Sequence, residues 1–179
     1  MSRCLFLGDS LIEYGDWDVL LPEFVVDNGG QAGETVEGLA ARLAAEISAA
    51  NEPDHLLLMS GTNNLLMGDT LFPTILESML QPIGALLPQA TVTINSLLPM
   101  DSAWLPADAV TAANRALCRI AKQGGVHFLD IHRLFLDQCS GGPRGCLAPD
   151  GVHLSAPGYS LWAQGLRTHF KSLDRLLTP

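Results

Sequence analysis

Five short apolar runs alternate along this chain with stretches in which apolar residues recur at helical spacing. Each run is almost continuous in apolar character, which is typical of strands that are covered on both faces. The runs are residues 3–7, 24–27, 55–59, 91–95 and 126–131. The helical spacing occurs in residues 36–47, 72–86, 110–120 and 159–170. This alternation predicts an α/β fold, in which a parallel sheet has helices on both faces.

Capping and turn-forming residues indicate where some of these helices begin and end. Ser155 is expected to cap the start of the last helix, and Gly124-Gly125 to end the third. Pro82 lies inside the second helical stretch and predicts a kink or break there. The chain has 179 residues and contains no linker or repeat, so we expect a single domain over residues 1–179.

Charge and hydropathy argue against several classes of partner. The formal net charge is −9 and the only lysines are Lys122 and Lys171, so there is no basic stripe for nucleic acid. An anionic membrane surface would repel the chain, and no apolar run reaches the roughly 18 residues that a span needs. The first strand begins at residue 3, which leaves no signal-peptide pattern. We therefore expect a cytoplasmic protein without stable membrane insertion; its oligomeric state stays open.

The cysteines and histidines predict no metal site. The four cysteines include no Cys-x-x-Cys pair and no zinc-like spacing, and the histidines also match no metal-ligand pattern. Cys139 and Cys146 are near enough in sequence to close a small loop. Because cytosolic proteins rarely keep disulfides, reduced thiols are the favoured interpretation.

Polar and glycine-rich segments follow the predicted strands. Ligands bind outside the carboxyl ends of the strands in a sheet of this kind, so we expect these segments to meet at one edge. They are residues 8–10, 28–33, 60–64 and 95–96. Residues 150–153 follow the fifth strand and can reach the same edge.

Five residues at this edge have the chemistry that acyl transfer requires. Ser10 offers a hydroxyl nucleophile, and His153 an imidazole base. Asp150 is placed to accept the Nδ1 hydrogen of His153, which leaves Nε2 free for the serine proton. The backbone N–H of Gly33 and the side-chain amide of Asn63 are donors for a developing oxyanion. Each residue alone also fits a turn or a helix cap, but their shared position favours a hydrolytic site.

These segments resemble the sequence blocks of the GDSL, or SGNH, hydrolase family. Gly8-Asp9-Ser10-Leu11 reproduces the first block, and Asp150-Gly151-Val152-His153-Leu154 the fifth. Residues 28–35 resemble the second block. Residues 61–64 resemble the third, with Asn64 where many members have aspartate. The resemblance implies a flavodoxin-like three-layer α/β/α sandwich with a five-stranded parallel sheet.

The resemblance also implies a mechanism. Ser10 would be the nucleophile, His153 the general acid–base and Asp150 its partner. The oxyanion hole would consist of the Ser10 and Gly33 N–H groups and the Asn63 side chain. No metal or organic cofactor would be needed. The chain would then be a serine hydrolase that cleaves carboxylic esters through an acyl-enzyme intermediate.

The substrate is less well defined by the sequence. The connections between the blocks are brief, which indicates an open, shallow cleft that suits short acyl or acetyl esters. Lysophospholipids, thioesters and O-acetylated sugars are alternatives, and outside catalysis the same edge would serve a non-catalytic ligand-binding domain. Candidate substrate contacts, each equally well explained by core packing, are Leu11, Asn64, Leu65 and Leu98, with Ile12, Leu66, Met67, Leu97 and Trp104 in a wider set.

Overall fold

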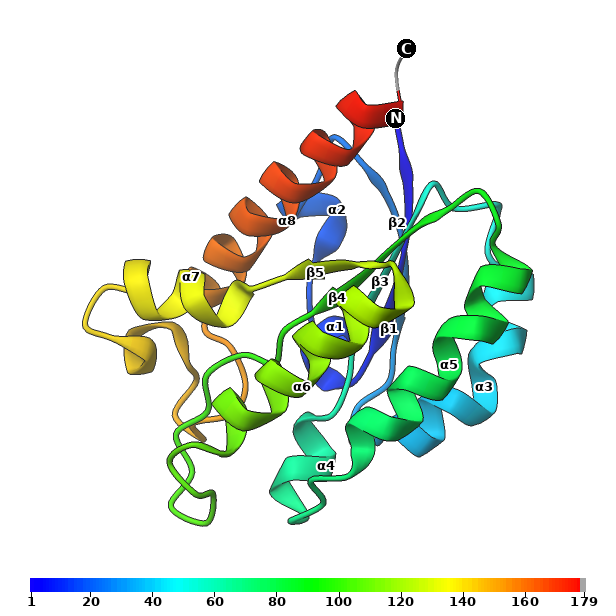
Figure 1. The fold of residues 1–179 in the computed structure, drawn as a ribbon. Coiled ribbons are helices and arrows are strands. Elements are labelled where there is room, and N and C mark those ends of the chain that lie inside the picture. Colours follow the sequence, from blue (N-terminus) through cyan, green and yellow to red (C-terminus); the bar gives the residue numbers. More distant parts are fainter. Residues whose placement is uncertain (178–179) are drawn as a thin grey trace.

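A five-stranded parallel sheet forms the centre of the molecule, and the computed structural model describes residues 1–177 (Figure 1). The strand order is β2-β1-β3-β4-β5, and every neighbouring pair is parallel. The strands are β1 (Arg3–Gly8), β2 (Val25–Gly30), β3 (His55–Met59), β4 (Thr91–Asn95) and β5 (His127–Leu129). The predicted α/β fold with five parallel strands is confirmed.

Helices cover both faces of the sheet. In Figure 1, α3 and α5 lie on one side of the strands and α8 lies on the other. The long helices are α3 (Val36–Ala49), α5 (Phe72–Leu86), α6 (Ala109–Gly124) and α8 (Ala156–Leu177). The short ones are α1 (Ser10–Glu13), α2 (Trp17–Leu20), α4 (Thr62–Leu66), α7 (Ile131–Gln138) and the 3₁₀ turn η1 (Pro143–Cys146).

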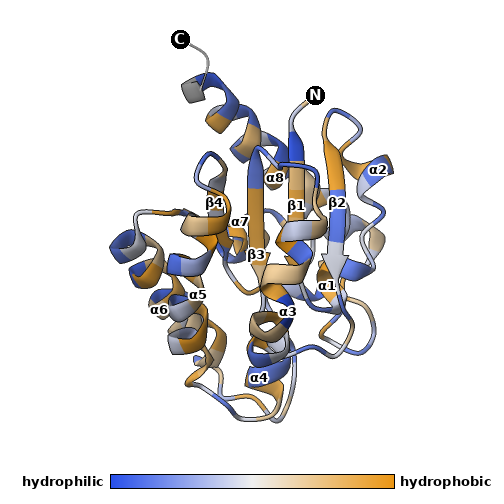
Figure 2. Ribbon diagram, turned by 90° about the vertical axis from the view of Figure 1, so that its right-hand side faces the viewer, coloured by the Kyte–Doolittle hydropathy of each residue, from blue (hydrophilic) through white to orange (hydrophobic). Residues whose placement is uncertain are grey.

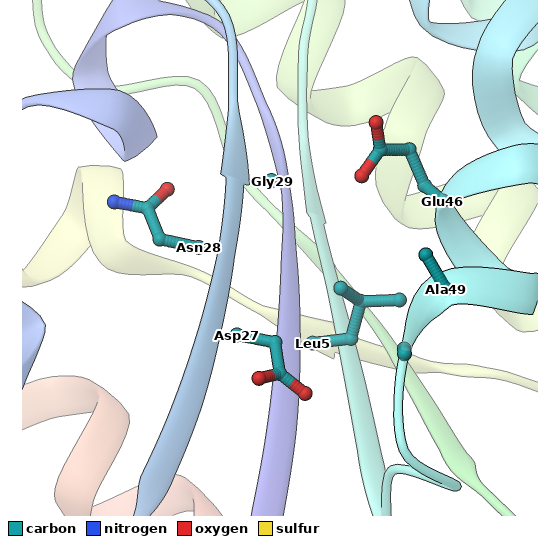
Figure 3. Close-up of a pocket in the computed structure, with 7 residues that line it drawn as sticks. Leu5, Asp27, Asn28, Gly29, Glu46 and Ala49 are labelled. Carbon is teal, nitrogen blue, oxygen red and sulfur yellow. The ribbon is translucent and has the colours of Figure 1, made fainter.

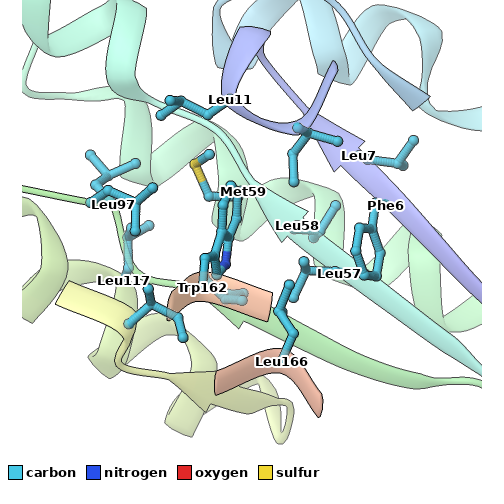
Figure 4. Close-up of a cluster of buried hydrophobic side chains, with 14 of the residues drawn as sticks. Phe6, Leu7, Leu11, Leu57, Leu58, Met59, Leu97, Leu117, Trp162 and Leu166 are labelled. Atoms are coloured by element: carbon cyan, nitrogen blue, oxygen red, sulfur yellow. The ribbon is translucent and has the colours of Figure 1, made fainter. Parts of the chain in front are cut away.

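The apolar runs form strands because both of their faces are covered. Leu56, Leu57 and Leu58 of β3 are completely buried, although alternate side chains of a strand point to opposite faces. Figure 4 shows how side chains of the central strands pack against Trp162 and Leu166 of α8. The indole Nε1 of Trp162 donates to Asn95 Oδ1 at 3.2 Å, so the one polar atom of this ring is satisfied inside the core.

Strand β2 differs from the prediction because it extends to Gly30. Residues 28–30 were expected to follow the strand, but they pair in register with residues 6–8 of β1. This edge strand is only partly buried, unlike β1 and β3. Pairing with β1 therefore extends β2 over polar and glycine residues, which the apolar pattern of the sequence does not predict.

The helix boundaries follow the expected signals in two of three cases. The hydroxyl of Ser155 accepts the N–H of Gly158 at 3.4 Å at the start of α8. Helix α6 ends at Gly124, and Gly125 adopts the left-handed conformation with φ of 67°. Helix α5 continues through Pro82, so of the expected kink or break the break does not occur.

Cys139 and Cys146 form a disulfide, so the expectation of reduced thiols is wrong for this pair. Between them the chain reverses at Gly141 and Gly142, which both have positive φ. This reversal brings the two Cα atoms to 6.0 Å, within the range that a disulfide needs. Cys4 and Cys118 are free.

Residues 1–177 contain no candidate for a membrane span or a metal site. No helix there has the length and apolar character to cross a bilayer. In the same residues, no three His, Cys, Asp or Glu side chains are grouped so as to hold a metal ion.

Candidate active site

Three side chains from opposite ends of the chain form a hydrogen-bonded relay. Ser10 Oγ lies 2.9 Å from His153 Nε2, and His153 Nδ1 lies 2.7 Å from Asp150 Oδ2. The relay forms at the carboxyl edge of the sheet, the edge towards which the arrows of β2 and β3 point in Figure 2, near α1 and α4. These distances are those of a nucleophile, its base and the group that orients the base.

The turn between β1 and α1 presents Ser10. Asp9 caps α1, since its Oδ1 accepts the N–H of Leu11 at 3.0 Å. Ser10 is therefore the first residue of a helix and is 7% exposed. Gly8 must be glycine because a Cβ there would collide with the carbonyl oxygen of Met59 on β3. The close approach of β1 and β3 at Gly8 thus fixes the position of Ser10 after the end of β1.

Asp9 is a buried acid directly before Ser10. Burial raises its pKa to about 6, against the opposing effects of the Leu11 N–H, the Thr62 hydroxyl and His153. The carboxylate atom Oδ2 and Thr62 Oγ1 are both buried, and neither makes a well-aligned hydrogen bond within the described structure. The Thr62 hydroxyl therefore lowers the pKa of Asp9 but leaves the hydrogen-bonding capacity of Oδ2 unfilled.

The Asp150 side chain is held by backbone N–H groups of the residues that follow it. Its Oδ1 accepts the N–H groups of Val152 and His153, both at 2.9 Å. The side-chain hydrogen bond from His153, followed by these two backbone N–H groups, lowers the pKa of Asp150 to about 2. Asp150 is therefore ionised at neutral pH and favours the His153 tautomer that has its hydrogen on Nδ1.

The segment that carries Asp150 and His153 is tied down at several points. Leu147 and Leu154 form an antiparallel bridge, and the N–H of Ala148 donates to the carbonyl of His153 at 2.7 Å. The carbonyl of Gly151 accepts the N–H of Asp101 at 2.8 Å. These bonds hold both catalytic candidates on a short hairpin-like loop.

The structure brings together the loops of the two other expected oxyanion donors. Gly33 has a φ of 77°, a conformation that favours glycine. Asn63 lies in the first turn of α4, and its Nδ2 donates to the carbonyl of Glu34 at 2.8 Å. This bond uses one amide hydrogen and leaves the second available. An oxyanion hole made of Gly33, Asn63 and the Ser10 N–H stays a prediction.

The expected substrate contacts are largely interior. Leu11, Leu65 and Leu98 are at most 4% exposed, as is Asn64. Asn64 uses its whole amide: Oδ1 accepts the N–H of Val36 at 2.9 Å, and Nδ2 donates to carboxylates at 2.9 and 2.8 Å. The structure therefore gives Asn64 a role in holding the start of α3. Substrate contact by any of these residues stays a prediction.

Tyr14 is a residue of this site that sequence reasoning missed. Its ring centroid lies 5.5 Å from that of His153, with 36° between the planes, and the residue is 57% exposed. The missed signal is its spacing, since Tyr14 follows Ser10 by four residues at the end of α1. Leu66 and Met67, at the end of α4, are also exposed.

The surface has several hollows, and one of them adjoins the loop that carries Asp150 and His153. This hollow, of about 280 Å³, is lined by Asp101, Arg144, Leu147, Ala148, Pro149 and Gly151. Another, of about 230 Å³, lies between β2 and the end of α3 and contains none of the three relay residues (Figure 3). A third, of about 480 Å³, lies between α7 and α8.

Several solved structures share this fold. A lipase/acylhydrolase from Enterococcus faecalis is 21% identical with a TM-score of 0.83, over 96% of each chain. A protein from Streptococcus pneumonia, provisionally described as a platelet activating factor, is 24% identical with a TM-score of 0.83, over 93% of this chain and 82% of its own. A variant acetyl xylan esterase from Geobacillus stearothermophilus is 19% identical with a TM-score of 0.73, over 92% of each chain.

The family assignment comes from the sequence itself. Among curated proteins, none matches the chain. At these identities the structural likeness shows the fold alone. The model of the GDSL-like lipase/acylhydrolase family matches residues 6–161, which include every residue of the relay. The chain therefore belongs to the GDSL-like lipase/acylhydrolase family of hydrolases.

Proposed function

We propose that this protein is a serine hydrolase that cleaves carboxylic esters through an acyl-enzyme intermediate. The observation that carries the proposal is the relay in which Ser10 Oγ, His153 and Asp150 are joined at 2.9 and 2.7 Å. Membership of a hydrolase family supports the same chemistry.

The first half of the reaction forms the acyl-enzyme. His153 Nε2 takes the proton of Ser10 as Oγ attacks the ester carbonyl, and Asp150 stabilises the resulting imidazolium. The Ser10 and Gly33 N–H groups and the free amide hydrogen of Asn63 receive the oxyanion. When the tetrahedral intermediate collapses, His153 gives its proton to the leaving alcohol.

The second half releases the acid. Water enters where the alcohol left, and His153 removes one of its protons as the water oxygen attacks the acyl carbonyl. The same donors receive the second oxyanion. Collapse then breaks the bond to Ser10 Oγ, which regains its proton from His153, and the free enzyme is restored.

We infer that the substrate is a small molecule with a short acyl group, such as an acetyl ester. The connections around the relay are short, and Leu11, Leu65 and Leu98 are packed in the core rather than lining a deep channel. One solved structure of the same fold is an acetyl xylan esterase, which favours O-acetylated sugars as a specific subclass. Lysophospholipids and thioesters are the competing substrates.

A panel of p-nitrophenyl esters of increasing acyl length tests this proposal, together with an acetylated sugar, a lysophospholipid and an acyl thioester. Ser10→Ala serves as the blank. We expect the highest kcat/KM for acetyl esters and no turnover in the blank. Preference for long acyl chains or thioesters would move the protein to the competing classes. Ser10-independent turnover, or none with any compound, would contradict catalysis and favour a ligand-binding domain.

The disulfide bears on the compartment in which the protein works. Disulfides persist in oxidising surroundings and are rare in the cytosol. The Cys139–Cys146 bond therefore favours an oxidising compartment over the cytoplasm expected from the sequence. Alkylation of intact cells before lysis tests this, since thiols at both positions in the captured protein would support the cytoplasm instead.

A further inference from the structure

A partly buried arginine beneath the loop that joins β2 to α3 is not used in the reaction described above. We propose that Arg42, together with Glu34, positions two of the oxyanion donors by holding residues 31–35, here called the oxyanion loop. The inference rests on the proposed function, because it assumes that Gly33 and Asn63 serve as donors. Arg42 belongs to α3 and touches no reacting atom, so its role is positioning rather than catalytic.

Arg42 donates two parallel hydrogen bonds to the carboxylate of Glu34. Its Nε donates to Oε1 and its Nη2 to Oε2, each at 2.7 Å. The two side chains are 14% and 9% exposed, so solvent screens this pair far less than a surface ion pair. A bidentate pair of this kind fixes both the position and the plane of the carboxylate.

Glu34 connects the Arg42 ion pair to both donors, Gly33 and Asn63. It directly follows Gly33, so fixing Glu34 limits how the Gly33 N–H can move. Its carbonyl oxygen accepts Asn63 Nδ2 at 2.8 Å, which aims the amide from α4. One residue therefore sets the position of a backbone donor and a side-chain donor that come from different segments.

The same guanidinium also ties the oxyanion loop to the strand that delivers the nucleophile. Nη2 donates to the carbonyl of Gly29 on β2 at 2.7 Å, with a longer contact to the carbonyl of Gly8 on β1 at 3.4 Å. The carbonyl of Gly8 also accepts the N–H of Gln31 at 2.9 Å. Because Gly8 lies two residues before Ser10, these bonds fix the oxyanion loop relative to the nucleophile.

The charge of Arg42 persists in this setting. Burial alone would lower the pKa of Arg42, but the hydrogen bonds and charges of Glu34 and Glu46 outweigh it and raise the pKa. Lysine cannot reproduce the arrangement, because an ammonium group lacks the planar fork that meets a carboxylate and a carbonyl together.

Glu46 provides a matched control on the same guanidinium. Its Oε1 lies 3.0 Å from Arg42 Nη1, and its side chain is 30% exposed. Glu46 lines the hollow beside Gly29 (Figure 3) and makes no printed contact with Glu34 or Asn63. Removing the Glu46 charge therefore perturbs Arg42 without releasing Glu34.

The test compares ester hydrolysis by wild type, Arg42→Ala, Arg42→Lys, Glu34→Gln and Glu46→Gln. We expect kcat to fall about 10- to 100-fold in Arg42→Ala, the scale on which misplacing catalytic groups by about 1 Å slows a reaction. KM and the pH dependence of kcat should change little, because the substrate site and the relay remain. Arg42→Lys should recover little of the loss, and Glu46→Gln should stay within about twofold of wild type.

Chemical rescue adds a readout that a purely structural role would not move. Guanidinium chloride at a low, non-denaturing concentration should raise the kcat of Arg42→Ala and leave wild type unchanged. An unchanged kcat in folded Arg42→Ala would overturn the proposal, as would a loss that guanidinium does not restore. If Arg42→Ala does not fold, Glu34→Gln decides: unchanged kcat overturns the proposal, and a fall at constant KM supports it. Absence of Ser10-dependent hydrolysis in wild type would instead reject the proposed function.

Discussion

The Nε2 atom of His153 lies 2.9 Å from the Oγ atom of Ser10, although 143 residues separate them in the sequence. Parallel strand order produces this contact, since β1 and the segment after β5 both reach the carboxyl edge of one sheet. The relay therefore depends on the fold as a whole.

Asp150→Asn should nearly abolish activity without unfolding the protein. The amide oxygen can still accept the N–H groups of Val152 and His153, but the amide nitrogen cannot accept the Nδ1 hydrogen. His153 would then favour the wrong tautomer, and the comparable change in a serine protease lowers kcat about 10⁴-fold. Steady-state kinetics measure this, with Asp137→Asn on the exposed face of α7 as the control. Activity within about tenfold of wild type would contradict the assigned role.

Asp9→Asn should stabilise the protein in a pH-dependent way. The pKa of Asp9 is raised from 3.8 to about 6, so its ionisation costs stability fully above pH 6 and not at all below pH 3.8. A shift of this size corresponds to about 2–3 kcal/mol. Asparagine removes the charge, keeps the cap on Leu11 and offers a donor to Thr62.

Melting temperatures at several pH values measure the effect. The Asp9→Asn variant should melt above wild type at pH 8, and the difference should vanish as the pH falls through 6 towards 4. Asp9→Ala also removes the helix cap, which costs about 1 kcal/mol, and should gain less. No gain at pH 8 for the asparagine variant would contradict the unfavourable burial of the Asp9 charge.

Reduction of the Cys139–Cys146 disulfide should destabilise the protein, and in particular the loop that carries Asp150 and His153. The bond closes a short loop directly before Leu147, where the segment that carries Asp150 and His153 begins. For a loop of this length, the loss of constraint on the unfolded chain amounts to about 2.5 kcal/mol. Urea unfolding with and without a dithiol reductant measures it, and Cys139→Ser should be insensitive to the reductant. Equal stability in both conditions would show that the bond contributes nothing.

Tyr14→Ala should weaken substrate binding more than it slows chemistry. The ring lies beside His153 and is more than half exposed. Because the proposed mechanism has His153 protonate the leaving alcohol, we expect this ring to contact that group. We expect KM for aryl esters to rise about threefold to tenfold, the scale of one lost aromatic contact. Tyr14→Phe keeps the ring and serves as the control. A fall in kcat at constant KM would show that Tyr14 supports His153 instead.

The main outlines of this protein are readable from its sequence because they follow from local patterns. The continuous apolar runs of β1 and β3 mark buried strands, and the rule for carboxyl ends brings Ser10 and His153 to one edge. Ser155 and Gly125 mark helix ends because capping depends on residues next to each other in the chain.

The features that the sequence did not reveal depend on contacts between distant residues. Asn64 looks like a loop amide, but it caps α3 through Val36 and has no donor left. The extension of β2 to Gly30 requires its register with β1. The bond between Cys139 and Cys146 requires the turn at Gly141 and Gly142, which composition alone does not specify.

Labelling with a fluorophosphonate probe, followed by peptide mass spectrometry, tests the nucleophile directly. We predict a single covalent adduct on Ser10 in wild type, no adduct in Ser10→Ala, and much slower labelling in His153→Ala. An adduct on another residue, or no labelling of the folded wild-type protein, would contradict Ser10 as the nucleophile.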